Sequence, residues 1–566
     1  MTFEQRILLQ GRRKTAMELA RHRLMVAVFL FIGAFSVMAL RTVELGLVEK
    51  LAEPAERSAA LPALAAGRAD IVDRNGVLLA TTLDTASLYA DPALVMDAED
   101  AARRLVGVLP GLSVAEVVAK LTSSRRFVWL KRKLTPAQQW RVNALGIPGL
   151  AFKPEEQRVY PHGRLAAHVL GYVDVDGQGL GGVEHFFNDR LTDPAHVGDR
   201  LALSLDTRVQ HALADELRAT MRVHSAAAAA GVVMDVASGE VLAMVSLPDF
   251  DPHQAGAATS EARFNRVTKG VYELGSTFKT FTMASALEIG AVRLGDSFDA
   301  TEPLRISRFT IRDDHARNRH LTVPEIFAYS SNIGSARIAH QMGADIQQAF
   351  LGRLGLLRPA TIELTEVGRP ITPDRWRDVS TMTISYGHGI AVSPLQLANA
   401  IAATVNGGVL IPATLVKESG IGDLQGQGPA AGQRVLSPAT SRTMRQLMRL
   451  VVTHGTGGNG DAPGYRVGGK TGTAEKAVAG RYHRKALMSS FVGVFPIEAP
   501  RYLVLAVVDE PRGTKQTFGF AGGGWVAAPV VRNTILRAAP LLGVTPAVAD
   551  ERMTQRVALH MAAEDD

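Results

Sequence analysis

The sequence of 566 residues contains no cysteine. Thiolate metal sites, cysteine nucleophiles and disulfide bonds are therefore excluded, although the absence of cysteine indicates no particular compartment. An excess of charge of one sign is also lacking, because 62 basic and 55 acidic residues leave a net charge of only +7. Part of this charge lies in the first 23 residues, so the composition does not favour nucleic-acid binding.

A phosphate-binding loop is absent as well. The glycine-rich run at residues 176–182 is followed by no P-loop lysine and has no strand-to-helix context. The remaining composition, with 46% hydrophobic and 21% charged residues, is typical of a globular chain. The length predicts two or three domains.

The amino terminus carries one apolar run, residues 24–40, which has no formal charge and follows a strongly basic segment. About 20 apolar residues usually span a bilayer, so these 17 are at the short end. The basic flank predicts a single-pass anchor with a cytoplasmic amino terminus, which leaves the chain after residue 41 outside the cytoplasm. The alternatives are a cleaved signal peptide, a twin-arginine signal at Arg12 and Arg13, and a buried core helix.

Turn and strand signals divide the region beyond the anchor. Asn75-Gly76 between apolar residues predicts a hairpin, and residues 97–121 have a helical pattern. Residues 125–133 form a basic and aromatic patch, which we interpret as a solvated face or a contact for lipid headgroups or a partner. Two apolar runs within residues 228–247 predict paired buried strands, and further strands are predicted near Val467 and at residues 490–495 and 502–509. Early and late strands with helices between them predict an α+β fold with an antiparallel sheet.

Three short motifs follow one another along the second half of the chain. Ser276 and Lys279 lie three residues apart at the start of a predicted helix that ends near Gly290, so both would lie on one helix face. The second motif is Ser330-Ser331-Asn332, and the third is Lys470-Thr471-Gly472-Thr473 at a predicted strand. Each motif alone is common, but all three in this order are specific.

These motifs resemble the S-x-x-K, S-x-N and K-T-G signatures of the penicillin-binding and serine β-lactamase superfamily. Further blocks resemble the class B penicillin-binding proteins, and among these the division-specific transpeptidases. The blocks are residues 68–80, 158–163, 167–184, 246–252, 386–396 and 522–530. The resemblance covers about residues 20–540, and it departs from the family at Leu274, where a proline is usual.

The motif residues predict a serine acyl-transfer site without a metal or an organic cofactor. Ser276 would be the nucleophile and Lys279 its general base, kept neutral by Lys470 and a desolvated cleft. Across the superfamily the acylating base is disputed, so this role stays open. Ser330 would relay the proton to the leaving amine, and Asn332 would hold the substrate amide and Lys279.

The third motif would bind the substrate. Lys470 supplies positive potential, the hydroxyls of Thr471 and Thr473 would bind a carboxylate, and Gly472 lies between them on the strand. By resemblance, the backbone N–H groups of Ser276 and Thr473 form the oxyanion hole.

The resemblance also implies a domain organisation. The predicted segments are a cytoplasmic basic tail (1–23), a transmembrane anchor (24–40), a juxtamembrane stalk (41–66), a pedestal (67–225), a transpeptidase domain (226–540) and a C-terminal tail (541–566).

The implied activity is D,D-transpeptidation of peptidoglycan stem peptides, with β-lactams as covalent inhibitors. The implied setting is the bacterial inner membrane at the division site, with the catalytic domain in the periplasm. A SEDS-family (FtsW-like) glycosyltransferase and other divisome membrane proteins are the partners that the resemblance implies.

Four other functions are compatible with parts of the sequence. A β-lactamase would need a deacylating base, and no Glu-x-x-x-Asn pattern lies between the second and third motifs. A bifunctional synthase would need a glycosyltransferase domain before Ser276. An elongation-specific class B enzyme commonly has Asp in place of Asn332. A non-catalytic scaffold or β-lactam sensor would not need the intact nucleophile and base.

Overall fold

The computed structural model describes residues 21, 23, 25–42, 67–196, 198–306, 309–417, 432–478, 481–547 and 552–561. The chain separates into two compact units, residues 1–66 and 67–566. In the first unit, Met25–Thr42 forms a helix with a mean hydropathy of 2.0, which is long and apolar enough to cross a membrane. Its side chains are exposed to the surroundings, as a lipid-facing helix requires. Almost all of the predicted basic tail and stalk lie outside the described residues.

A five-stranded sheet organises the start of the second unit, in the order β3-β2-β1-β7 with β4 also paired to β2. The predicted Asn-Gly hairpin is confirmed, because β1 and β2 pair antiparallel and Gly76 has a φ of +83°. The elements of this region are β1 (Asp70–Val72), β2 (Leu78–Ala90), η2 (Pro92–Leu94), α3 (Ala98–Val108), α4 (Val114–Leu121), β3 (Val128–Leu134), α5 (Pro136–Asn143), β4 (Leu150–Val159), η3 (Gly163–Ala166), α6 (Ala167–Leu170), β5 (Tyr172–Val173), β6 (Gly179–Gly181), α7 (Gly182–Phe186), α8 (Asn188–Thr192), η4 (Pro194–His196) and β7 (Arg200–Ala202).

The helical pattern over residues 97–121 forms two helices rather than one. Asp97 caps α3 and Ser113 caps α4, each through a side-chain oxygen that accepts backbone N–H groups of the first turn. Between the helices the chain reverses at Pro110 and at Gly111, which has a φ of +85°. Apolar side chains of both helices and of β3 form a separate small core.

A second five-stranded sheet forms the centre of the remaining, larger part of this unit. Its strand order is β16-β17-β18-β8-β9, all neighbours being antiparallel. The strands are β8 (Ala228–Asp235), β9 (Val241–Leu247), β16 (Gly468–Val478), β17 (Arg481–Phe495) and β18 (Tyr502–Asp509). The predicted pairing of early and late strands is therefore confirmed by β18 and β8, and the α+β fold class is confirmed with it.

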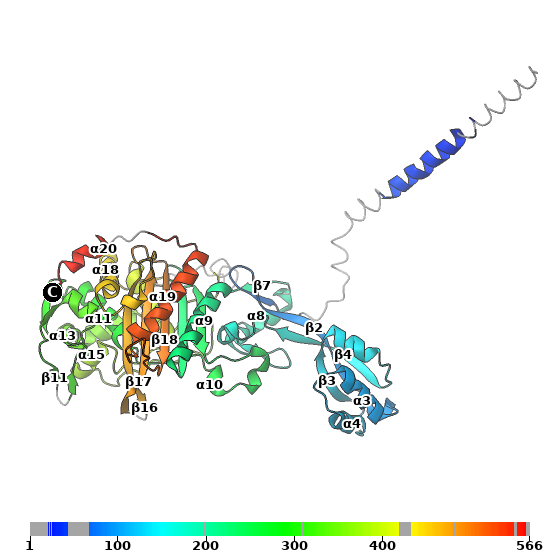
Figure 1. The fold of residues 1–566 in the computed structure, drawn as a ribbon, viewed down its shortest axis with the longest axis horizontal. Coiled ribbons are helices and arrows are strands. Elements are labelled where there is room, and N and C mark those ends of the chain that lie inside the picture. Colours follow the sequence, from blue (N-terminus) through cyan, green and yellow to red (C-terminus); the bar gives the residue numbers. More distant parts are fainter. Residues whose placement is uncertain are drawn as a thin grey trace, which may run out of the picture. The chain divides into compact units, whose positions relative to one another are not determined.

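Helices cover both faces of this sheet. On one face, α9 (Thr207–His224) and α19 (Gly523–Leu541) pack against side chains such as Val233 and Val504. On the other face, α11 (Lys279–Glu288), α16 (Pro394–Val405) and α18 (Pro438–His454) pack against alternate residues such as Val232 and Leu505 (Figure 1). Burial on both faces explains why the sequence of β18 is a continuous apolar run. A strand with one face in water would instead alternate apolar and polar residues.

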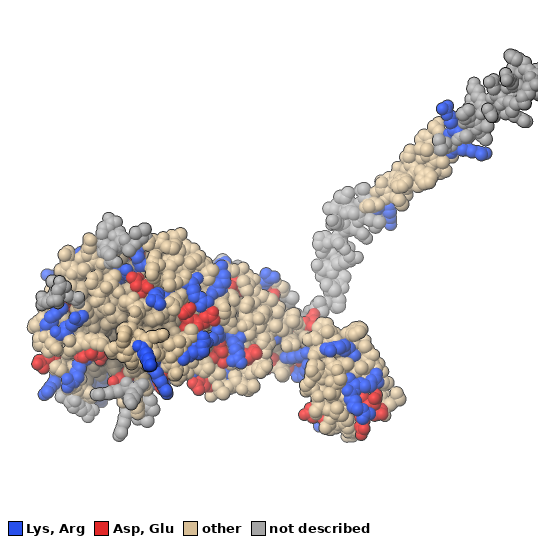
Figure 2. All heavy atoms as spheres, viewed as in Figure 1, with Lys and Arg blue, Asp and Glu red and all other residues tan. Residues whose placement is uncertain are grey.

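Shorter elements surround these layers. They are η5 (Pro252–Ala257), α10 (Ser260–Arg263), η6 (Gly275–Phe278), β10 (Ser297–Asp299), β11 (Leu304–Ile306), β12 (Phe309–Ile311), β13 (His320–Thr322), α12 (Val323–Ala328), α13 (Asn332–Met342), α14 (Ala344–Arg353), α15 (Asp378–Ile384), β14 (Val409–Leu410), β15 (Gln433–Arg434), η7 (Gly458–Gly460) and α20 (Arg552–Ala558). Within the predicted C-terminal tail, α20 contacts α18 and buries Val557 in the main core. Basic and acidic side chains are interspersed over the face shown in Figure 2, in keeping with the small net charge.

Candidate active site

Ser276 lies in the 3₁₀ turn η6, directly before α11, and not in the α-helix itself. The turn depends on Gly275, which has a φ of +56° and whose added Cβ would lie 2.4 Å from the carbonyl oxygen of Thr473. Only a glycine therefore lets the turn that carries Ser276 lie against β16. In a 3₁₀ turn, residues i and i+3 are eclipsed, so Ser276 and Lys279 still share one side as the sequence predicted.

The Lys279 side chain is fully buried, and its amine contacts Ser276 directly. Nζ lies 2.8 Å from Oγ of Ser276, 2.6 Å from the carbonyl oxygen of Ser330 and 2.7 Å from Oδ1 of Asn332. The amide of Asn332 is oriented by its Nδ2, which donates to the carbonyl oxygen of Arg312 at 2.9 Å. In its neutral form the amine can donate its two N–H groups to these two pure acceptors, which leaves its lone pair for the hydroxyl of Ser276 or of Ser330.

The Ser330 hydroxyl bridges the two lysines of the site. Its Oγ lies 3.0 Å from Nζ of Lys279 and 3.0 Å from Nζ of Lys470. The residue adopts a left-handed conformation, with a φ of +62°, in the short connection between α12 and α13. Such strain in a non-glycine residue is tolerated where the surrounding contacts hold it, and it often marks functional positions.

Asp313 supplies those contacts, although no motif marked it as a site residue. Its carboxylate accepts hydrogen bonds from Oγ of Ser331 at 2.7 Å and from the backbone N–H groups of Asn332 at 2.6 Å and Ile333 at 2.9 Å. A carboxylate at a helix start stabilises the free N–H groups there. Asp313 therefore fixes the start of α13, where the second motif lies, but nothing local in the sequence distinguishes it from the neighbouring Asp314.

Lys470 is the second fully buried lysine. Its Nζ lies 3.2 Å from the carbonyl oxygen of Thr471 and 5.8 Å from the centre of the Phe327 ring. Burial lowers its pKa well below the usual value, and the charge of Lys279 lowers it further. Burial also lowers the pKa of Lys279 to about 7, whereas the carboxylates of Asp313 and Asp314 act in the opposite direction. Because both amines contact one hydroxyl, a proton on one disfavours a proton on the other.

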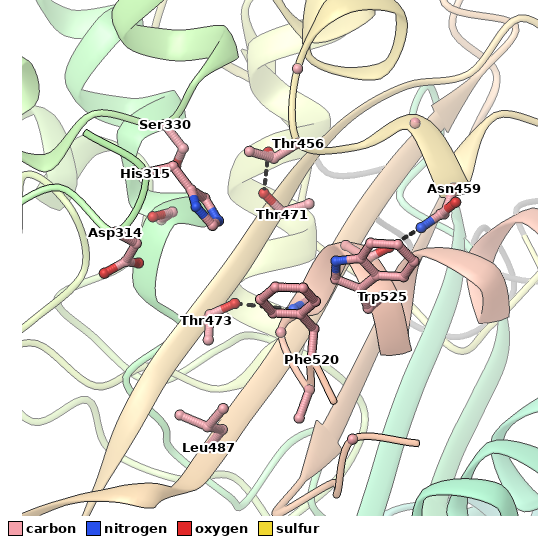
Figure 3. A pocket seen from close by; sticks show the side chains of 18 of the residues that line it. Asp314, His315, Ser330, Thr456, Asn459, Thr471, Thr473, Leu487, Phe520 and Trp525 are labelled. Atoms are coloured by element: carbon pink, nitrogen blue, oxygen red, sulfur yellow. Dashed lines mark hydrogen bonds between the residues drawn. The ribbon is translucent and has the colours of Figure 1, made fainter. Parts of the chain in front are cut away.

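The K-T-G strand presents its threonines to the same cleft. Oγ1 of Thr471 and Oγ1 of Thr456 are hydrogen-bonded at 2.6 Å, and Oγ1 of Thr473 accepts the backbone N–H of Gly523 at 3.0 Å (Figure 3). A Cβ added to Gly472 would lie 2.3 Å from Oγ of Ser490 and 2.4 Å from the carbonyl oxygen of Leu274. Gly472 thus allows β16 to approach both its neighbouring strand and the nucleophile turn.

A cleft of about 960 Å³ opens over these groups. Ser276, Ser330, Thr471 and Thr473 lie along it, and the stacked rings of Phe520 and Trp525, with centres 5.9 Å apart, form part of its wall (Figure 3). The cleft wall also contains residues that the sequence did not single out as site residues. These are Asp314, His315, Arg317, Tyr329, Thr456 and Asn459.

The structure brings the sequence-predicted site residues together. Ser276, Lys279, Ser330, Asn332 and Lys470 are linked by direct hydrogen bonds, as described above, and the strand with Thr471, Gly472 and Thr473 forms one side of the cleft. A buried amine beside a hydroxyl, with donors and cations around an open cleft, can carry out acyl transfer through a serine ester.

Comparisons with known families agree with this chemistry. The family described as the penicillin binding protein transpeptidase domain matches residues 229–536, and the penicillin-binding protein dimerisation domain matches residues 63–192. A solved peptidoglycan synthetase from Bifidobacterium adolescentis has a TM-score of 0.67 and 25% identity over 86% of this chain and 97% of that one. The fold and the site thus define a penicillin-binding protein with a transpeptidase domain.

Curated relatives narrow the family further. The probable peptidoglycan D,D-transpeptidase FtsI of Caulobacter vibrioides is 42% identical over 84% of this chain and 82% of its own length. The peptidoglycan D,D-transpeptidase FtsI of Escherichia coli is 31% identical over 84% and 83%, and the probable transpeptidase PenA of Neisseria gonorrhoeae is 34% identical over 87% and 86%. The chain belongs to the class B penicillin-binding proteins of the FtsI type.

Proposed function

We propose that the protein is a D,D-transpeptidase that cross-links peptidoglycan stem peptides in septal cell-wall synthesis. The relatives of the FtsI type carry this activity in their names, and the chain matches most of their length. The observation that carries the proposal is the contact of 2.8 Å between Oγ of Ser276 and Nζ of Lys279, with the other two amine positions occupied by carbonyl acceptors.

Acylation begins with transfer of the Ser276 proton to the lone pair of Lys279. Oγ then attacks the carbonyl carbon of the D-Ala–D-Ala amide, and the backbone N–H groups of Ser276 and Thr473 stabilise the oxyanion. The close contact of the Gly275 turn with the Thr473 backbone supports this assignment. The C–N bond breaks, and the proton held by Lys279 passes through the Ser330 hydroxyl to the departing amine of D-alanine.

The terminal carboxylate of the donor peptide binds on the other side of Ser330. Lys470 supplies positive charge there, and the hydroxyls of Thr471 and Thr473 donate hydrogen bonds. In the second half-reaction an amine of a neighbouring stem peptide loses a proton to the same relay and attacks the ester. The ester C–O bond breaks, the cross-link forms and Ser276 regains its proton. A β-lactam acylates Ser276 in the same way, but its leaving group stays tethered.

The membrane setting follows from the amino-terminal helix. Met25–Thr42 is long and apolar enough to cross a membrane once, which fits a single-pass membrane protein. Arg21 and Arg23 precede the helix, which supports a cytoplasmic amino terminus and a catalytic domain in the periplasm. At the division site, a SEDS-family (FtsW-like) glycosyltransferase would supply glycan strands. The proposed domain organisation comprises a pedestal (67–225) and a transpeptidase domain (226–540).

Labelling of the full-length protein with a fluorescent penicillin tests the acyl-enzyme. We expect a covalent band for the wild type, none for Ser276→Ala, and a rate reduced by about 10² to 10⁴ for Lys279→Ala. The exposed Lys269 provides a matched control, and Lys269→Ala should label like the wild type. A band that survives in Ser276→Ala would remove this serine from its role, and no band in the wild type would favour a scaffold.

Localisation of a fluorescent fusion tests the division role. Fluorescence at the sidewall instead of at midcell would favour a function in elongation.

A further inference from the structure

Three aromatic rings and a carboxylate form a cluster beside the nucleophile turn. The ring centre of His388 lies 5.3 Å from that of Tyr386 and 5.7 Å from that of Tyr482. The hydroxyl of Tyr482 donates to the carboxylate of Glu273 at 3.0 Å, and the N–H of Gly389 donates to the same carboxylate at 3.0 Å. We call these four side chains, Glu273, Tyr386, His388 and Tyr482, the aromatic box.

The aromatic box is next to the reacting serine. Glu273 precedes Ser276 by three residues. Gly387, between two residues of the box, has a φ of +83°, and an added Cβ would lie 2.1 Å from the carbonyl oxygen of Gly275. The backbone beneath the box is therefore in direct contact with the turn that carries the nucleophile.

The box also lies beyond the carboxylate end of the cleft. Thr471, Thr473 and Glu475 alternate along β16 and therefore share one face of the strand. Leu487, the partner of Glu475 on β17, lines the cleft beyond Thr473 (Figure 3). Glu475 lies four positions after Thr471 on the strand, a distance of about 13 Å. Tyr482 is the register partner of Ala477, two residues beyond Glu475 on β16, so this second carboxylate lies on the part of the strand next to the box.

We propose that the aromatic box binds the side-chain ammonium group of the donor stem peptide, on the residue that precedes D-Ala–D-Ala. This inference rests on the proposed function, because the terminal carboxylate of the donor is taken to bind at Thr471. Two extended residues span about 7 Å, and an amino-bearing side chain of four or five carbons adds about 6 Å. A donor lying along β16, with this side chain extended along the strand direction, would bring the amine to the level of Glu475 and the box.

The chemistry of the box suits a cation. Aromatic faces attract an ammonium group, and a carboxylate at the edge adds a charge-assisted hydrogen bond. Burial lowers the pKa of His388, so the ring is neutral near pH 7 and does not repel the ligand. Its Nδ1 is buried and has no hydrogen-bond partner among the described residues. Burial also raises the pKa of Tyr386 to about 12, which keeps its hydroxyl neutral.

Competition between donor peptides and a fluorescent penicillin tests the proposal on the full-length protein. The probes are Nα-acetyl-L-Lys-D-Ala-D-Ala, with a free side-chain amine, and its Nε-acetylated counterpart. We expect the free amine to halve the labelling rate of the wild type at a concentration roughly three- to tenfold lower than the acetylated peptide requires. Glu273→Gln keeps a hydrogen-bond acceptor for Gly389 and Tyr482 but loses the negative charge. In this variant both peptides should halve the labelling rate at about the same concentration.

Two further variants separate recognition from a general disturbance of the site. Tyr482→Leu removes one wall of the box from a different strand and should also reduce the preference for the free amine. The exposed Glu302 offers a matched loss of charge outside the box, and Glu302→Gln should keep the wild-type preference. Equal competition by both peptides in the wild type, competition by neither, or an unchanged preference in Glu273→Gln would overturn the proposal. In each of these cases penicillin labelling of Ser276 would still support the transpeptidase assignment. If the wild type were not labelled at all, both the transpeptidase assignment and the ammonium-binding proposal would fail.

Discussion

Lys279 donates a hydrogen bond of 2.7 Å from its buried Nζ to Oδ1 of Asn332. The neutral amide accepts this bond without adding a charge, so the amine can remain deprotonated and accept the proton of Ser276. A carboxylate at the same position would instead favour the ammonium form. We therefore expect the identity of residue 332 to affect the protonation state of Lys279, the proposed base.

The first prediction concerns Asn332→Asp. A negative charge within hydrogen-bond distance should raise the pKa of Lys279 by about one to three units. Acylation by penicillin should then slow about tenfold or more at pH 7 and recover above pH 9. Asn318→Asp, an exposed position, adds the same charge outside the site and should leave the rate unchanged. An Asn332→Asp variant with a wild-type pH profile would contradict the assignment of Lys279 as the base.

The second prediction is the pH profile of the wild type. Burial lowers the pKa of Lys279 to about 7, and only the neutral amine can take the Ser276 proton. The acylation rate should thus rise tenfold per pH unit below this value and level off above about pH 8. Stopped-flow measurement of acylation between pH 5 and 9 checks the profile. A rate that continues to rise up to pH 10 would indicate an unperturbed lysine.

The third prediction compares the adjacent Asp313 and Asp314. Both carboxylates raise the pKa of Lys279, so replacement of either by Asn should move the midpoint of the acylation profile to lower pH. Only Asp313 holds the hydrogen bonds at the start of α13, so only Asp313→Asn should also reduce the maximal rate and the thermal stability. We expect a destabilisation of about 1 to 2 kcal/mol, measured by thermal unfolding. Equal losses in both variants would argue against this helix-capping role.

Much of the site could be predicted because its chemistry is local in sequence. The pair Ser276 and Lys279 is defined by a spacing of three, which aligns the side chains in an α-helix and in the 3₁₀ turn found here. The two apolar runs within residues 228–247 likewise predicted paired buried strands, which β8 and β9 confirm. Lys470 was identified only through its motif, because a lysine on a strand is more often solvated than buried.

The remaining features depend on tertiary placement. Asp313 reaches the second motif across a separation of 18 residues to Ser331, and Thr456 meets Thr471 across 15 residues. Neither position has a periodicity or a turn signal that marks it. The steric need for glycine at position 275 also appears only when β16 lies against the turn. Such contacts arise from the packing of separate elements, which a single sequence does not reveal.

The last prediction concerns the stability of the pedestal. The carboxylate of Glu184 is fully buried and pairs with two buried guanidinium groups, Arg68 at 2.5 Å and Arg158 at 2.7 Å. In Glu184→Gln the neutral amide would leave both cations without a counter-charge. Its NH₂ group would also face a guanidinium N–H, and two donors cannot form a hydrogen bond. Removing one member of a buried ionic cluster costs about 3 to 5 kcal/mol, so the melting temperature should fall by several degrees.

An exposed ion pair in the same region provides the control. Glu99 pairs with Arg103 at 3.5 Å, and their side chains are 74% and 60% exposed. Glu99→Gln removes the same charge but should change the stability by less than about 0.5 kcal/mol, because water screens the pair. Circular dichroism of the three proteins during heating compares the two sites. If Glu184→Gln had the same melting temperature as Glu99→Gln, the buried ionic cluster would not contribute to the stability of the proposed pedestal. The stability of this region would then depend on its apolar core alone.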